Sequence, residues 1–338
     1  MKSQANRQVR LKSRPTGIPQ ADNFEIVTAA LPDIADRQFL VRNEYLSVEP
    51  AMRGWVSAVT NYSTPVGIGE VMRAFSAGTI VASRHPNYRE GDTVMGMLGW
   101  QEYSISDGST VTRKVKEKDL PLSLSLGILG LNGVTAYFGL LDVGQPRPGD
   151  TVVVSTAAGA VGSAVGQIAK LMGCRTVGLT GGPTKCKLCL EEFGYDEAID
   201  YKGGALAVAL AQACPRGIDV YFDNTAGSIS DAVLPQLAVC ARVVICGTAS
   251  VASWDPPPTG PRVERHILVK RAQMAGFLIF DYQHRYEEAV TRLAEWVRQG
   301  RLRYREDIAE GIEKCPGAIA ELYRGENLGK RLIRLREH

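Results

Sequence analysis

Apolar and polar residues alternate in short stretches over roughly the first 125 residues, where Gly and Pro separate one stretch from the next. The alternation is clearest in FLVRNEYLSVEP, SAGTIVAS, GDTVMGM and QEYSISDG. A period of two is typical of strands that bury one face. The sequence therefore predicts a β-rich first third.

A different pattern begins near Leu126, where LGILGLNGVTAYFGLLDV predicts a helix and GQPRPGD a turn. From Thr151 onward, continuous apolar runs rich in β-branched residues alternate with helical segments. Alternation of this kind predicts a parallel sheet, and the unbroken apolar strands indicate burial on both faces. We expect strands at 151–155, 175–180, 198–201, 218–224 and 241–247, and helices at 160–173, 183–194, 205–214 and 228–239.

The last third predicts a loop at 248–263, a strand at 274–282, a helix at 285–300 and a strand at 329–335 that returns to the first domain. A chain of 338 residues exceeds the size of one ordinary core, so we expect two domains that share a cleft. The fold class is α/β, with a doubly wound parallel sheet over 126–299. Residues 1–125 and 300–338 form the second domain.

Composition narrows the class of protein. With 45% hydrophobic and 22% charged residues, the chain is expected to be globular. The net charge of +3 is too small for a nucleic-acid footprint. No apolar run is long enough to span a membrane, and no leader pattern stands near the start. We expect a soluble, cytosolic protein that acts on small molecules, without nucleic-acid or membrane partners.

The seven cysteines are an odd number and favour free thiols in a reducing compartment. Cys186 and Cys189 form a C-x-x-C pair, but they lie in a helical segment and no second pair follows. We interpret them as ordinary helix residues rather than as a redox or zinc pair. The four histidines do not cluster, so no metal site is predicted.

The segment TVVVSTAAGAVGSAVG carries the clearest functional motif. A strand ends at Ser155, and a helix follows a turn of the A-x-G-x-x-G form of the dinucleotide fingerprint. The missing side chains let a pyrophosphate approach the backbone, and the helix N-terminus favours negative charge. The predicted contacts are Ala157, Gly159, Ala160, Val161 and Gly162.

The end of the second strand distinguishes NAD from NADP. An NAD site places an acid there, whereas this chain has Leu179, Thr180, Gly181 and Gly182, followed by Lys185 and Lys187. Without an acid and with a cation, the site favours a 2′-phosphate and thus NADP. We assign Gly181 and Lys185 to that phosphate and interpret Lys187 as a solvated residue. Tyr201 either adds a hydroxyl there or is a plain strand-end aromatic.

The run AAGAVGSAVGQIAKLMGCRTVGLTGG, with LNGVTAYFGLLDVGQPRPGD before it and YFDNTAG after it, resembles the zinc-independent branch of the medium-chain dehydrogenase/reductases. Within that branch it is similar to the NADPH-dependent alkenal/one oxidoreductases, which include the prostaglandin and curcumin reductases. The likeness continues through YLSVEPAMRGW, PVGIGEVMRAFSAGTIVASRHPNYREGDTVMG, GWQEYSISDG and ENLGKRLI, and so covers nearly the whole chain. It implies a partly open, GroES-like β-barrel catalytic domain built from both chain ends, an inserted Rossmann domain and often a homodimer.

Zinc alcohol dehydrogenases share that architecture, so their zinc ligands are the natural comparison. The first 173 residues contain no cysteine, and Gly69, Glu70 and Val71 stand where the zinc enzymes carry Gly-His-Glu. The sequence therefore gives no support to a zinc-activated reaction.

The resemblance implies that NADPH passes a hydride to the β-carbon of an α,β-unsaturated aldehyde or ketone. Charge then develops on the carbonyl oxygen, and a proton from Tyr or water completes the reduction at the α-carbon. Tyr62 is the candidate for the catalytic hydroxyl, with an apolar wall contact as the alternative. Relatives often carry a second tyrosine near the position of Glu264 and Arg265, which this chain lacks.

The resemblance also supplies the remaining candidates. Further cofactor contacts are expected at Asn224, Cys246, Gly247, Phe277, Ile279 and Asn327, and substrate contacts at Met52, Trp55, Tyr62, Trp254 and Tyr282. Tyr103 and Ser104 are interpreted as structural. Two other functions remain open: an NADPH:quinone reductase, and a nucleotide-binding protein without catalysis.

Overall fold

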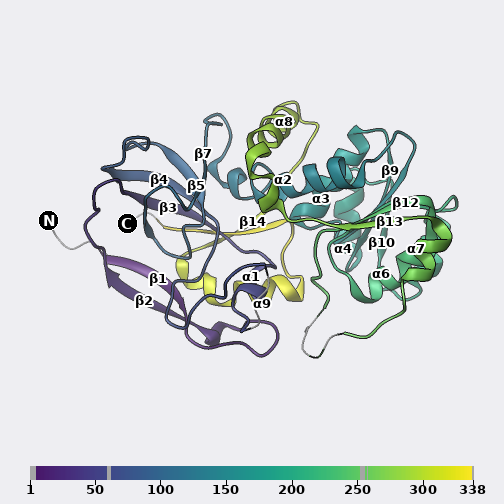
Figure 1. The fold of residues 1–338 in the computed structure, drawn as a ribbon, viewed down its shortest axis with the longest axis horizontal. Helices are drawn as coiled ribbons and strands as arrows, with labels where there is room; N and C mark the ends of the chain where they lie inside the picture. Colours follow the sequence, from purple (N-terminus) through teal and green to yellow (C-terminus); the bar gives the residue numbers. More distant parts are fainter. Residues whose placement is uncertain (1–4, 59–61, 252–255, 257, 337–338) are drawn as a thin grey trace. The chain divides into compact units, whose positions relative to one another are not determined.

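The computed structural model describes residues 5–58, 62–251, 256 and 258–336. The chain forms two compact units. One comprises Met1–Gly127 and Glu306–His338, and the other comprises Ile128–Arg305. Each unit has its own sheets (Figure 1).

The first unit contains a seven-stranded sheet and a two-stranded hairpin. The strands of the large sheet are β3 (Phe39–Ser47), β4 (Ser76–Ser83), β5 (Thr93–Gly96), β6 (Tyr103–Ser106), β7 (Val111–Lys114), β14 (Glu306–Glu310) and β15 (Lys330–Arg334). The hairpin pairs β1 (Ala5–Leu11) with β2 (Phe24–Ala30). The helical segments are η1 (Ala21–Asn23), α1 (Met52–Trp55), η2 (Leu122–Leu126), η6 (Ile312–Lys314) and α9 (Cys315–Arg324).

Pairing of β15 with β3 joins the two ends of the chain in one sheet. The strand order is β14-β15-β3-β4-β5-β7, with β6 paired to β3. Among the described residues no ladder joins β14 to β7, so the sheet stays open, as a partly open barrel requires. Figure 1 shows the yellow strand β14, from the last part of the chain, with the purple and blue strands of this unit. The predicted return of 329–335 to the first domain is confirmed.

The second unit is a six-stranded parallel sheet covered by helices. Its strands are β8 (Thr151–Ser155), β9 (Arg175–Thr180), β10 (Glu197–Asp200), β11 (Ile218–Asp223), β12 (Leu237–Ile245) and β13 (Gln273–Gly276). Its helical segments are α2 (Leu131–Phe138), η3 (Gly139–Gly144), α3 (Ala160–Leu171), α4 (Pro183–Glu191), α5 (Leu206–Ala213), α6 (Gly227–Val233), η4 (Leu234–Gln236), α7 (Glu264–Lys270), η5 (Ile279–Arg285) and α8 (Tyr286–Arg298).

The order β10-β9-β8-β11-β12-β13 is that of the doubly wound dinucleotide-binding fold. Val153 and Tyr221 pack with Leu210 of α5 and Val233 of α6 in one buried cluster. Helix α3 packs on β8 and β9, and α2 packs against α3 and α8. Burial of the strands on both sides explains why they read as unbroken apolar runs. The α/β prediction is confirmed, and the order reverses between β8 and β11.

Two predicted elements differ from the structure. The strand expected at 274–282 ends at Gly276, because its partner strand β12 ends at Ile245. The 3-10 helix η5 begins at Ile279 and includes the remaining residues up to Tyr282. The helix expected at 228–239 ends at Val233, because Pro235 follows at once and Leu237 already begins β12. Helix α9 and strand β14 were not predicted.

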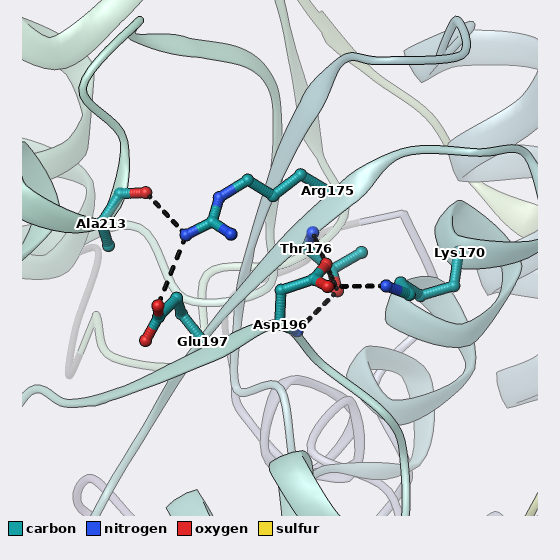
Figure 2. A network of polar contacts seen from close by, with 6 residues as sticks. All are labelled: Lys170, Arg175, Thr176, Asp196, Glu197 and Ala213. Atoms are coloured by element: carbon teal, nitrogen blue, oxygen red, sulfur yellow. Dashed lines mark hydrogen bonds and ion pairs between the residues drawn. The ribbon is translucent and has the colours of Figure 1, made fainter.

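A polar network holds the amino ends of β9 and β10 (Figure 2). The carboxylate of Asp196 accepts hydrogen bonds from the Thr176 amide at 2.8 Å, the Thr176 hydroxyl at 3.2 Å and the Lys170 ammonium at 2.7 Å. Beside it, Arg175 donates to the Ala213 carbonyl at 3.2 Å. Burial opposes the charge of Asp196, but the ammonium and amide outweigh it and lower the pKa of this carboxyl. The network braces the sheet at the end opposite the glycine turn.

Asp196→Asn is expected to lower the free energy of unfolding by about 1–2 kcal/mol at neutral pH, because charged hydrogen bonds are lost. A depressed pKa stabilises the fold above the pKa of the unfolded chain, about 3.9, and this contribution disappears as the pH falls below it. The deficit should therefore shrink at pH values of about 3.5 in urea unfolding curves. Glu197→Gln, which loses only an exposed contact of 3.5 Å, is the control. An unchanged deficit at low pH would contradict this account.

Candidate functional site

The turn between β8 and α3 depends on the glycines at positions 159 and 162. Thr156 adopts a left-handed backbone with φ of +55°, and the Gly159 amide donates to the Thr156 carbonyl at 2.9 Å. A Cβ on Gly162 would lie 2.3 Å from that carbonyl oxygen and 2.9 Å from Cα of Ala157. Only glycine at 162 lets α3 start this close to the strand. The first amides of α3, from Ala160 on, thus lie at the carboxyl edge of the sheet, where an anion binds well.

Tyr195 supports this turn from the connection between α4 and β10. It is buried, and its hydroxyl donates to the Gly162 carbonyl at 2.6 Å. A Cβ on Gly166 would come within 2.1 Å of its ring, and one on Gly178 within 3.2 Å. The sequence interpretation missed Tyr195, although a glycine inside a helix and another inside a strand both signal a close neighbour.

The end of β9 brings together the residues expected at the 2′-phosphate. A Cβ on Gly181 would lie 2.9 Å from the Tyr201 hydroxyl and 3.1 Å from Cε of Lys202. Burial, and then the nearby ammonium of Lys202, lower the pKa of Lys185. Lys185 and Lys202 disfavour each other's positive charge, and a bound anion between them would offset that repulsion. Lys187 instead is exposed and pairs with Glu191 at 3.8 Å.

Lys202 was not singled out from the sequence. It follows Tyr201 directly after a predicted strand, and that position was the available signal. Its own amide and that of Gly182 donate to the Asp200 carboxylate at 2.9 and 2.8 Å. These hydrogen bonds lower the pKa of Asp200. The acid at the end of β10 therefore fixes the loop that carries Gly181.

Asn224 lies at the point where the strand order reverses. Its amide donates to the Ser155 hydroxyl at 2.8 Å, and its side-chain nitrogen donates to the Ser155 carbonyl at 2.7 Å. The amides of Cys246 and Gly247 donate to the Asp223 carbonyl at 2.8 and 3.1 Å. The fold thus gathers these three candidates at the carboxyl ends of β8, β11 and β12. Burial raises the pKa of the Cys246 thiol to about 12, which argues against a nucleophile.

Ala226, just before α6, has φ of +58° and ψ of −160°, a region that side chains rarely adopt. The carboxylate of Asp223 accepts its amide at 2.8 Å, and the Ser250 hydroxyl donates to its carbonyl at 3.0 Å. These contacts hold an unfavourable conformation in place.

Ala226→Gly is expected to raise the free energy of unfolding by about 1 kcal/mol, because glycine adopts this conformation without a steric penalty. Thermal or urea unfolding measures the gain. Ala211→Gly, at an exposed site within α5, should instead lower stability by about 1 kcal/mol. A loss of stability in both variants would show that Ala226 is not strained.

Phe277 and Tyr282 meet in an aromatic cluster of the second unit. Their ring centroids lie 6.3 Å apart at 86°, and Tyr282 stacks on buried Phe138 at 4.6 Å. A Cβ on Gly139 would lie 2.5 Å from Phe277. Ile279 is half-buried at the start of η5. The cluster therefore joins one expected cofactor contact to one expected substrate contact.

The candidates of the first unit differ in exposure. Met52 and Trp55 of α1 are buried, so they form core contacts here, and a substrate contact for either stays a prediction. Tyr62 is 50% exposed, so it is not part of the core. Trp254 lies outside the described residues. For Asn327, the side-chain nitrogen donates to the Gly329 carbonyl at 2.7 Å and caps the turn before β15.

Tyr62 has an aromatic neighbour that the sequence did not indicate. Tyr323 of α9 donates to the Pro50 carbonyl at 3.0 Å, and Arg53 lies over its ring at 5.4 Å. Burial raises the pKa of Tyr323, Arg53 opposes this, and Tyr62 adds to the increase. The two phenols are therefore electrostatic neighbours.

Other residues singled out from the sequence have structural contacts. Ser104 donates to the Leu98 carbonyl at 2.7 Å, and the Tyr103 amide donates to Asn6 at 3.0 Å. Glu264 is exposed, and its ion pair with Arg262 lowers its pKa to about 2. Arg265 is also exposed, in helix α7.

The donor set does not fit zinc. The Glu70 carboxylate accepts the Gly67 amide at 2.7 Å and caps a turn, with no histidine in the adjacent motif. Cys186 and Cys189 share helix α4, and burial raises the pKa of both thiols. Within the described ranges, no three His, Cys, Asp or Glu side chains gather as a metal site would require.

Among the residues that the structure describes, every helix is too short or too polar to cross a lipid bilayer.

Comparisons with known proteins place the chain among dehydrogenase-like enzymes. A family model described as the N-terminal domain of oxidoreductase matches residues 7–114, and one described as zinc-binding dehydrogenase matches 160–295. The chain is 43% identical to an NADPH-dependent curcumin reductase of Escherichia coli, over 98% of this chain and 97% of that protein.

Two further relatives are similar over almost their full length. The chain is 37% identical to an NADP-dependent 2-alkenal reductase of Nicotiana tabacum, over 97% of both chains. The crystal structure of CurA from Vibrio vulnificus in complex with NADPH matches with a TM-score of 0.91 at 42% identity, over 98% of this chain and 100% of that one.

Proposed function

The chain belongs to the medium-chain dehydrogenase/reductases, in their group of NADPH-dependent alkenal and enone reductases, and from this membership we propose that it reduces the carbon–carbon double bond of α,β-unsaturated aldehydes and ketones with NADPH. Two observations carry the proposal. At Gly162 a Cβ would collide with the backbone of the turn, so only glycine fits there. The cations Lys185 and Lys202 lie near each other beyond the carboxyl ends of β9 and β10.

The residues of the second unit fit NADPH. The first turn of α3, with Ala157, Gly159 and Gly162, would hold the pyrophosphate. Lys185, Tyr201 and Lys202 would hold the 2′-phosphate. Further contacts are proposed at the strand ends and in the first unit, namely Ala160, Val161, Gly181, Asn224, Cys246, Gly247, Phe277, Ile279 and Asn327. The second unit is then the cofactor-binding domain, and the first unit is the catalytic domain.

When bound, NADPH supplies a hydride for the β-carbon of the substrate. The chain's own task is to accommodate the negative charge that develops on the carbonyl oxygen. The hydroxyl of Tyr62, which is 50% exposed, would donate a hydrogen bond to that oxygen, and Tyr62 or water would deliver the proton to the α-carbon. One hydride and one proton thus saturate the double bond.

Carbonyl polarisation in this scheme comes from hydrogen-bond donors and needs no zinc. The metal-donor side chains are engaged otherwise, since Glu70 accepts a hydrogen bond within a turn and the C-x-x-C thiols share one helix. The free cysteines suit a reducing cytoplasm.

Steady-state assays with NADPH and either a 2-alkenal, an enone or a quinone test the proposal. We expect oxidation of NADPH with the first two only, and Tyr62→Phe should lower kcat by about 10²-fold or more while NADPH affinity is unchanged. Turnover with quinones alone would replace the proposal by a quinone reductase. Tight NADPH binding without any turnover would indicate a protein that has lost catalysis.

We also propose a homodimer formed through β13. All four residues of this strand are exposed, and it is the last strand of its sheet, so its backbone can pair with another strand. Nearby segments carry exposed apolar side chains, namely Leu268, Val269, Met274, Leu278 and Phe280. Light scattering should give twice the chain mass, and Met274→Lys should give a monomer. A monomeric native protein would refute this interface.

A further inference from the structure

Lys330, the first residue of β15, is buried together with Glu49, and each side chain is only 4% exposed. The ammonium donates to Oε1 of Glu49 at 2.6 Å, to the Ser47 hydroxyl at 2.7 Å and to the Val48 carbonyl at 3.1 Å. Three acceptors match the three N–H donors of a lysine. The Ser47 hydroxyl in turn donates to the same Glu49 oxygen at 2.6 Å. The side chain is therefore fixed in every direction.

The ion pair joins two segments that are 281 residues apart. Glu49 lies between β3 and α1, three residues before Met52. Lys330 directly follows the turn that Asn327 caps. The ladder between β15 and β3 starts only at Leu332. The ammonium thus links the two segments before regular strand pairing takes over.

A second carboxylate faces the same lysine. Glu306 lies opposite Lys330 in the pairing of β14 with β15, and it accepts a hydrogen bond from the Ser123 hydroxyl at 2.8 Å. Burial raises the pKa of Glu306, and Lys330 opposes that increase. Burial lowers the pKa of Lys330 itself, while Glu49 and Glu306 favour its charge. Removing the cation would leave two carboxylates without their compensating charge.

We propose that Lys330 is a positioning residue for the reductase reaction, because its buried contacts with the Glu49 carboxylate, the Ser47 hydroxyl and the Val48 carbonyl fix the Asn327 turn against the segment that carries α1. The inference rests on the proposed function, in which Asn327 contacts the cofactor, and on the predicted substrate contacts of Met52 and Trp55 in α1. A buried ion pair adds little net stability over apolar residues of similar volume. What this one adds is a defined geometry between two loops.

The test compares Lys330→Met, Glu49→Gln and the double variant with the native chain. Either single change leaves a buried polar group without its partner and should lower Tm, whereas the double variant should recover only part of that loss, because Glu306 still lacks its compensating cation. We expect the double variant to keep a kcat/KM about 10- to 100-fold below native, because a small displacement of a positioned group carries that cost. Its Kd for NADPH, measured by fluorescence quenching, should rise as well. The matched control removes the exposed pair Arg324 and Glu326 of the same segment and should leave both constants unchanged.

Amide hydrogen exchange gives a readout that does not depend on catalysis. In the double variant, exchange should accelerate in 47–55 and 326–331 and stay native elsewhere. A double variant with native Kd for NADPH, native kcat/KM and native exchange in these two segments would overturn the positioning role, whatever its Tm. If the native protein neither binds NADPH nor reduces enones, the proposed function fails, and exchange alone then decides whether Lys330 fixes the two segments.

Discussion

Gly162→Ala is expected to abolish NADPH binding at ordinary cofactor concentrations. The added methyl group would lie 2.3 Å from the Thr156 carbonyl oxygen and 2.9 Å from Cα of Ala157, and both are backbone atoms that cannot rotate away. Helix α3 would have to move off the turn and release the hydroxyl of Tyr195. We expect Kd to rise by about 100-fold or more, equivalent to about 2.7 kcal/mol, and stability to fall by about 1–3 kcal/mol.

Fluorescence titration with NADPH and urea unfolding measure the two effects separately. Gly317→Ala is the matched control, because a Cβ there meets only a flexible Glu321 oxygen at 3.6 Å within helix α9. It should leave the Kd unchanged and stability equal or slightly higher. A Gly162→Ala protein that binds NADPH as tightly as the native chain would remove the turn from the site.

The sequence predicted this turn well because its signals are local. A β-branched run, three small residues at fixed spacing and an amphipathic helix follow one another within about 20 residues, and each restricts the backbone independently. The alternation of strands and helices likewise predicted a parallel sheet. The left-handed conformation of Thr156 was not predictable, because threonine rarely adopts it and only the surrounding contacts impose it.

The missed features depend on contacts between distant residues. Tyr195 reaches Gly162 across 33 residues, and Lys330 reaches Glu49 across 281. A single sequence shows such pairs only as an isolated tyrosine or lysine. The error over 274–282 has the same origin, since an apolar run favours a strand until the partner strand ends at Ile245 and Tyr282 stacks on Phe138 instead.

Lys185→Ala and Lys202→Ala should each weaken NADPH binding while leaving NADH binding almost unchanged. Each removes one of two neighbouring cations, and a charged hydrogen bond to phosphate contributes about 1.5–3 kcal/mol, so KM for NADPH should rise about 10- to 100-fold. NADH lacks the 2′-phosphate, so its KM should change by no more than about twofold.

The two lysines should also act together. Burial and the charge of Lys202 lower the pKa of Lys185, so phosphate binding must offset a repulsion that either single variant removes. The double variant should therefore lose more NADPH affinity than the sum of the single losses, a coupling that a double-mutant cycle measures. Lys187→Ala, on the exposed side of the same helix, is the control and should alter neither KM. Equal effects on NADPH and NADH would place the 2′-phosphate elsewhere and leave the glycine turn as the only anchored part of the cofactor site.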